Sequence, residues 1–377
     1  MSAPSTSPKT HVFLVPGFFG FTNLGDFAYF SHAKETLELE LRKRGSSAEV
    51  HPLDTLPTGS VRKRAAHLVS RIREHVDPGD AIHLIGHSTG GVDVRLVVSE
   101  GLDVPGRDAI LGDIRTAISI ASPHRGSPIA GFFSSILGQR LLRLLSLSTI
   151  HIIRLGSIPL PALLLLGGAV AGTGAFRWAS GGVLDQVYQL VLRDFDAERR
   201  QQLEDFFNEA QKDQTLLLQL TPESMELVDA LARPVPGVRY GCVVGLAPKP
   251  SMKVQRRLGA NPTWQAMYAF YRGLHLITSA VPSAVEFTPT AEQAQALRAH
   301  LGRVPSRNDN DAMVPALSQL WGEVIHATVA DHMDVMGHFH GPLDHPRHVD
   351  WMRTGSGFDV RRFEALFASV AGFITAE

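Results

Sequence analysis

The sequence predicts an α/β fold in which a mostly parallel, doubly wound sheet carries one largely helical, apolar insertion. Short apolar runs typical of buried strands alternate with stretches whose apolar residues recur at helical spacing. This alternation predicts a parallel sheet covered by helices on both faces. Between residues 131 and 220 the alternation stops, and leucine-rich segments replace it. We therefore expect residues 1–130 and 221–377 to form the core and residues 131–220 to form a cap.

The first part of the chain supplies three strands of this sheet and two helices. Apolar runs predict strands over residues 12–15 and 81–85, and residues 48–52 can supply another strand between them. Between the first two strands, apolar residues at 27, 30, 37 and 41 predict a helix that ends at Gly45. Before the third strand, an apolar stripe over residues 61–76 predicts a helix that Ser60 caps.

The later strands are expected over residues 116–120, 239–244 and 324–329.

Within the insertion, residues 155–176 carry no charge, and this run is long enough to span a bilayer. A spanning helix, a buried core helix and an apolar cap that opens onto a lipid surface all fit this composition. Pro159, Pro161 and five glycines favour the cap over a transmembrane span. The polar stretch 194–214 would then be its solvated, helical flank.

Composition narrows the class of protein. The formal net charge is −1, which gives no indication of nucleic-acid binding. We expect the basic runs 42–44 and 62–64 to lie on solvated helix faces.

Cys242 is the single cysteine, and its apolar neighbours predict a buried, inert thiol. The polar N-terminus leaves no room for a secretory leader before the first strand, so we expect a cytoplasmic protein.

The most informative segment is Gly86-His87-Ser88-Thr89-Gly90, which follows a predicted strand and precedes a predicted helix. G-x-S-x-G in this setting is the sequence form of a nucleophile elbow, a turn so sharp that only small residues fit two places before and after the serine. The turn exposes the serine hydroxyl, and the next helix directs its N-terminal amides toward it. A plain glycine-rich turn is the alternative interpretation. We expect Ser88 to be a nucleophile.

A serine nucleophile needs a base, and the base needs a carboxylate to hold its tautomer. In α/β enzymes with such a turn, the acid and then the histidine follow on loops after later strands. Asp309 and Asp311, in the polar loop 308–315, compete for the acid role, and we favour Asp311. His332 directly follows the last predicted strand and is the expected base. Its rivals are the other histidines of this region, His326, His338, His340 and His345.

Two backbone amides should stabilise the oxyanion. One is expected from Thr89, the residue after the nucleophile. The other is expected from Phe18, in the loop 15–20 after the first strand, where Gly17 allows close approach. Alternatively, this loop is only a turn whose phenylalanines pack in the core.

These segments resemble the α/β-hydrolases of the bacterial triacylglycerol lipase type. The resemblance rests on five places, Val15–Phe18, Gly86–Gly91, Ser122–Ser127, Asn310-Asp311 with Val314, and Asp331–Asp334. It implies an α/β-hydrolase fold with a lid, Ser88 as nucleophile, Asp311 as acid, His332 as base, and Phe18 and Thr89 as oxyanion donors. Many members hold a structural calcium through an aspartate two residues after the histidine, and Asp334 has that position. No other cofactor is implied.

We therefore expect a serine carboxylester hydrolase that cleaves apolar acyl esters, at a lipid interface or in solution, through an acyl-enzyme. An acyltransferase, a polyester depolymerase or a phospholipase would use the same three residues. A non-catalytic binding protein with this fold is a further alternative, which the intact serine, aspartate and histidine argue against.

Overall fold

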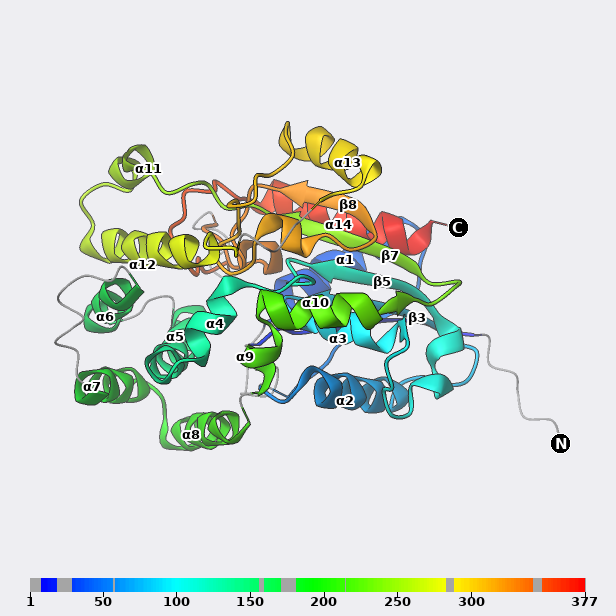
Figure 1. The fold of residues 1–377 in the computed structure, drawn as a ribbon, viewed down its shortest axis with the longest axis horizontal. Helices are drawn as coiled ribbons and strands as arrows, with labels where there is room; N and C mark the ends of the chain where they lie inside the picture. The colour runs from blue at the N-terminus through cyan, green and yellow to red at the C-terminus, as the bar shows by residue number, and fades with distance from the viewer. Residues whose placement is uncertain are drawn as a thin grey trace.

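The computed structural model describes residues 8–18, 29–56, 58–155, 159–170, 181–213, 215–282, 288–341 and 348–376. A six-stranded sheet in the order β2-β1-β3-β5-β7-β8 forms the centre, and every neighbouring pair in it is parallel. Helices cover both of its faces (Figure 1). The predicted parallel, doubly wound sheet is therefore confirmed.

Each strand of this sheet coincides with a predicted strand. The strands are β1 (Thr10–Val15), β2 (Glu49–Pro52), β3 (Ala81–His87), β5 (Ile114–Ile120), β7 (Arg239–Gly245) and β8 (Glu323–Thr328). Two short strands, β4 (Ser99–Glu100) and β6 (Arg233–Pro234), form a separate antiparallel pair that we did not predict. Cys242 lies fully buried in β7, as expected.

The alternation of side chains along β1 explains why both faces need helices. Val12 and Leu14 pack in one apolar cluster, together with α1 (Ser31–Lys43) and α14 (Val360–Thr375). Phe13 and Val15 pack in a second cluster, with α2 (Val61–Arg73) and α3 (Thr89–Val97). Both faces of the strand are buried from Val12 to Val15, and these four residues are accordingly all apolar rather than alternating. At the outer edge, α13 (Ala291–Leu301) packs against β8.

The insertion is helical in the part that the structure describes. It holds α4 (Pro128–Ser134), α5 (Ile136–Leu155), α6 (Leu160–Val170), α7 (Gly181–Leu192), α8 (Ala197–Lys212) and α9 (Thr215–Gln219). α8 lies within the predicted polar helix. Parts of the uncharged run, residues 156–158 and 171–176, lie outside the described residues. None of the described helices combines the length and apolarity needed to cross a membrane.

Helices that follow the insertion in the sequence pack against it. α12 (Pro262–Thr278), which we did not predict, packs against α6, and α5 packs against α7 (Figure 1). α10 (Pro222–Leu231) follows α9, and the short α11 (Met252–Arg257) precedes α12. Leu141, Leu144 and Leu145 of α5 are buried in the same apolar cluster as α1 and α14. The insertion is therefore packed onto the core and partly buried.

Candidate active site

Ser88 lies at the turn between β3 and α3, with φ 54° and ψ −127°. A positive φ is costly for a non-glycine residue and marks a backbone that the surrounding structure holds in place. A Cβ atom at Gly86 would collide with the backbone of Gly90, and one at Gly90 would collide with the carbonyl oxygen of Val15. Only glycine fits at both positions, which is the physical requirement behind the G-x-S-x-G pattern.

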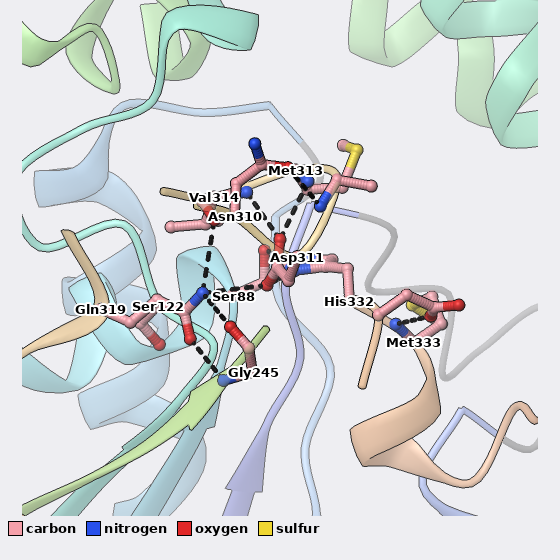
Figure 2. Close-up of polar contacts among 12 residues, drawn as sticks. Ser88, Ser122, Gly245, Asn310, Asp311, Met313, Val314, Gln319, His332 and Met333 are labelled. Atoms are coloured by element: carbon pink, nitrogen blue, oxygen red, sulfur yellow. Dashed lines mark hydrogen bonds and ion pairs between the residues drawn. The ribbon is translucent and has the colours of Figure 1, made fainter. Parts of the chain in front are cut away.

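A continuous chain of hydrogen bonds joins Ser88 to two distant segments. His332 Nε2 lies 2.9 Å from Ser88 Oγ, and His332 Nδ1 lies 2.8 Å from Asp311 Oδ2 (Figure 2). Because an ionised carboxylate only accepts, Nδ1 carries the proton and Nε2 presents its lone pair to the serine hydroxyl. All three side chains are buried. This arrangement can take a proton from the hydroxyl and return it to a leaving group.

Backbone and side-chain donors fix the carboxylate of Asp311. Its Oδ1 accepts from the amides of Met313 and Val314 at 2.9 and 2.7 Å. Its Oδ2 accepts from Gln319 Nε2 at 3.2 Å in addition to His332. The Gln319 amide is itself held by Gly245, whose N–H donates to Oε1 at 2.8 Å (Figure 2). Our sequence reasoning missed Gln319, because nothing in the loop pattern marks it.

Asp309 lies apart from His332 and has other partners. Its carboxylate pairs with Arg303 at 2.5 Å and with Lys249 at 3.2 Å. Burial opposes ionisation of this carboxyl, but hydrogen bonds from Arg303 and from the Ser306 amide bring its pKa down to about 2. Of the two aspartates that the sequence offered for the acid role, Asp311 therefore contacts His332, whereas Asp309 pairs with Arg303 and Lys249.

The rival histidines lie elsewhere. His326 is on β8, where its Nδ1 contacts Ser369 Oγ at 3.1 Å. His338 is buried near His32, and burial lowers its pKa to about 3. His340 is exposed. His345 lies outside the described residues.

A second buried histidine supports the loop that carries His332. His87 Nε2 lies 2.9 Å from the backbone oxygen of His332, and His87 Nδ1 lies 2.5 Å from Tyr29 Oη. Burial holds the pKa of His87 well below its usual value, so the ring is neutral. Its Nε2–H donates to the carbonyl, and its Nδ1 accepts from the tyrosine. The variable position inside the G-x-S-x-G pattern thus holds the backbone of His332, which we did not predict.

The prediction for the basic run 62–64 is wrong at Arg64. This side chain is fully buried, with Nη2 2.6 Å from Asp93 Oδ2 on α3. The same nitrogen lies 3.4 Å from the oxygen of Pro16 and from Thr89 Oγ1. Position 64 lies on the buried side of α2, and a carboxylate 29 residues further on compensates its charge. The other two members of the run, Arg62 and Lys63, are exposed as expected.

Phe18 and Thr89 both line the apolar pocket that contains Ser88 and His332. Thr89 is the first residue of α3. The loop that carries Phe18 crosses directly over the serine, since a Cβ atom at Gly17 would lie 2.7 Å from Ser88 Cβ. Side chains from both the core and the insertion form the rest of this pocket, including Ile129, Phe133, Leu142, Leu217, Leu220 and Met313. Phe19 and Gly20 of the expected loop lie outside the described residues.

Three aspartates lie close together in the segment that follows β8 and contains His332. Ligand oxygens of Asp331, Asp334 and Asp350 lie within 4.8 Å of one another. Burial raises the pKa of Asp331 to about 7 and that of Asp350 to about 8, and burial also raises the pKa of Asp334 well above its ordinary value. We predicted Asp334 as a calcium ligand but not its two neighbours. Clustered carboxylate oxygens are the ligand type that calcium prefers, so the residues present fit the ion.

Comparisons with known proteins agree with this architecture. No protein-family model matches the chain. A triacylglycerol lipase from Vibrio cholerae is 26% identical over 134 residues, which are 35% of this chain and 38% of the lipase. The chain thus spans well under half the length of the curated relative that it matches.

Three solved structures align with nearly the whole chain, each with a TM-score of 0.50. A metagenomic carboxyl esterase is 14% identical, and the alignment covers 98% of this chain and 76% of the esterase. EstA from Clostridium botulinum is 16% identical, with 98% of this chain and 89% of EstA covered. Lipase 1 from Pelosinus fermentans is 15% identical, with 98% of this chain and 100% of the lipase covered. The chain therefore has the α/β-hydrolase fold of these bacterial lipases and esterases.

Proposed function

We propose that this protein is a serine carboxylester hydrolase acting on apolar acyl esters. The observation that carries the proposal is the hydrogen-bonded chain from Ser88 Oγ through His332 to Asp311 Oδ2. The chain opens into a pocket formed almost entirely by apolar side chains. An activated hydroxyl beside an apolar pocket suits acyl transfer from a lipid-like ester.

In the first half of the reaction, Ser88 Oγ attacks the ester carbonyl carbon while His332 Nε2 takes the hydroxyl proton. Asp311 holds the imidazole in the required tautomer and stabilises the imidazolium that forms. The tetrahedral intermediate collapses when the C–O bond to the alcohol breaks and His332 gives its proton to that oxygen. The alcohol leaves, and the acyl group remains on Ser88.

In the second half, His332 takes a proton from water, whose oxygen attacks the acyl carbon. Collapse of the second intermediate releases the carboxylic acid and returns the proton to Ser88 Oγ. The backbone amides of Phe18 and Thr89 would donate to the oxyanion in both steps, and losing one such donor costs about 3 kcal/mol in comparable sites.

The pocket favours medium or long acyl chains. Leu142 on α5 and Leu217 on α9 bring apolar surface from the insertion to the same cavity as Ser88. Several leucines of the insertion are exposed, among them Leu164 with 57% of its surface accessible. Exposed apolar side chains on the insertion suit contact with a lipid interface.

Hydrolysis of a series of nitrophenyl esters, from acetate to palmitate, tests the proposal. We expect wild type to turn over the longer esters faster and Ser88→Ala to lose turnover while keeping its fold by circular dichroism. Ser46→Ala, on the loop before β2, is the matched control and should retain wild-type rates. Undiminished activity in Ser88→Ala would end the assignment.

We further propose that Asp331, Asp334 and Asp350 hold a structural calcium ion. Each of the three residues packs within the loop that follows β8, and two of them flank His332. Backbone amides and the hydroxyls of Thr354 and Ser356 donate to two of the carboxylates, so the loop already orients them. The ion would offset their mutual repulsion and brace the loop that carries the base.

Calcium removal should therefore lower both stability and activity. We expect a chelator to reduce the thermal midpoint and the esterase rate, and added calcium, but not magnesium, to restore both. Asp334→Asn should reduce the response to calcium. A thermal midpoint that is identical with chelator and with calcium would contradict the proposal.

A further inference from the structure

A second cluster of metal-ligating side chains lies at the opposite end of the sheet from Ser88. His11 is the second residue of β1, whereas Gly17 lies beyond the other end of that strand. Glu49 and His51 lie two residues apart on the neighbouring edge strand β2, and Glu49 is paired with His11. Since side chains alternate along a strand, Glu49 and His51 point to the same face of the sheet. The esterase proposal makes no use of these residues.

We propose that His11, Glu49 and His51 bind a divalent transition-metal ion of the zinc class. His11 Nδ1 lies 3.0 Å from His51 Nε2, and the same His51 nitrogen lies 3.8 Å from Glu49 Oε2. One ligand atom from each residue falls within 4.8 Å of the others. Two ligands of a tetrahedral zinc ion, with bonds of 2.0–2.1 Å, lie roughly 3.3 Å apart. The two distances that involve His51 therefore differ from this spacing by only about 0.3 and 0.5 Å.

A buried carboxylate orients the deepest ligand. His11 Nε2 lies 3.2 Å from Asp80 Oδ2, and both are buried. Asp80 is in turn held by the backbone amides of Lys9 and Asp77, at 2.8 and 2.9 Å. The carboxylate accepts the Nε2–H proton, which leaves the lone pair of Nδ1 directed toward His51. A carboxylate that hydrogen-bonds the outer nitrogen of a ligating histidine is the usual support of a zinc site.

The cluster is rigid on its inner side and open on its outer side. The His51 ring stacks on Phe13, with centroids 5.1 Å apart and planes at 26°. His11 is only 2% exposed, whereas the Glu49 side chain is 52% exposed, so an ion can enter from solvent and keep a water ligand. Two further groups face this opening, Lys9 with Nζ 3.6 Å from Glu49 Oε1 and His75 with its ring 4.8 Å from that of His51.

Two of the three ligands are imidazole nitrogens, and this determines which class of metal ion the site prefers. Calcium and magnesium take oxygen ligands, whereas nitrogen ligands with one carboxylate suit zinc and its neighbours. The ion would join the edge strand β2 to β1 through side chains, in addition to the backbone ladder. Its effect would be on stability, since Ser88 lies at the other end of the sheet.

Zinc titration against a chromophoric competing chelator tests the inference. The buffer contains excess calcium, so that zinc does not bind at the cluster of aspartates near His332. We expect wild type to bind one tight zinc ion that His51→Gln and His11→Gln do not bind. Asp80→Asn should weaken the binding by roughly 10–100-fold, because the orienting carboxylate is lost. Zinc should also raise the thermal midpoint of wild type but not that of His51→Gln.

His326→Gln is the matched control, because it removes one member of another histidine pair, whose rings lie 5.0 Å apart. This variant should bind zinc as wild type does. Esterase activity in the calcium buffer, without added zinc, reports folding of every variant. Equal zinc affinity in wild type and His51→Gln would overturn the inference, and so would a loss of zinc in His326→Gln matching that in His51→Gln.

Discussion

At the scale of single residues, the position of His332 depends on side chains that take no part in bond breaking. Asp311 orients its ring, His87 holds its backbone oxygen, and Gln319 holds the Asp311 carboxylate. The sequence motif located Ser88, and the position after the last strand located His332. The roles of His87 and Gln319 could not be predicted, because each is defined by a contact with a distant segment. Gln319, for example, bonds to Gly245, which lies 74 residues earlier.

The two aspartates of the acid loop should respond differently to the same substitution. Asp311→Asn would donate to His332 instead of accepting, so the imidazole would adopt the wrong tautomer, and kcat should fall by about 10⁴-fold. Asp309→Asn should leave kcat unchanged and lower stability, because Arg303 and Lys249 would lose their partner. Steady-state kinetics and urea denaturation of both variants check this. A loss of kcat in Asp309→Asn alone would reverse the assignment.

At the scale of elements, the strands were predictable because their signal is local. A buried strand needs only a short apolar run, and each run that we predicted forms a strand of the central sheet. α12 was missed, although Asn261 and Pro262 form a helix start, and Asn261 accepts from the amides of Thr263 and Trp264. The burial of Arg64 could not be predicted, because the sequence does not show that α2 packs against α3.

The contact between α2 and α3 gives a second prediction. Arg64→Met would leave Asp93 as an uncompensated buried charge, so the free energy of unfolding should fall by about 3–5 kcal/mol. Arg64→Met combined with Asp93→Leu should recover most of that loss, since apolar pairs commonly replace buried ion pairs at little cost. Urea denaturation measures both effects. Additive losses in the double variant would show that the two side chains do not act as a pair.

At the scale of the whole molecule, several buried histidines favour the neutral form. Burial lowers the pKa of His83 to about 4, with Arg115 and Arg239 adding to the effect. His275 and His326 are also lowered to about 4 by burial. In the unfolded chain each histidine titrates near 6.5. For each of these three histidines the unfolded chain therefore binds more protons between pH 6.5 and pH 4, and the contribution of the histidine to stability falls as the pH falls through this range.

Urea denaturation between pH 7 and pH 5 tests this expectation. His83 alone should account for a loss of about 2 kcal/mol at pH 5. His83→Gln removes that titration, so its free energy of unfolding should depend less steeply on pH than that of wild type. His67→Gln is the control, because His67 is partly exposed on α2. The same pH dependence in wild type and His83→Gln would contradict the assignment.

The central claim is that His332 activates Ser88 at the end of the sheet, and covalent labelling tests it most directly. A fluorophosphonate probe reacts with activated serines, and peptide mass spectrometry locates the adduct. We predict one adduct per chain, on Ser88, with a labelling rate that falls by about 10²–10⁴-fold in His332→Ala. An adduct on another serine, or an unchanged labelling rate without His332, would contradict the claim.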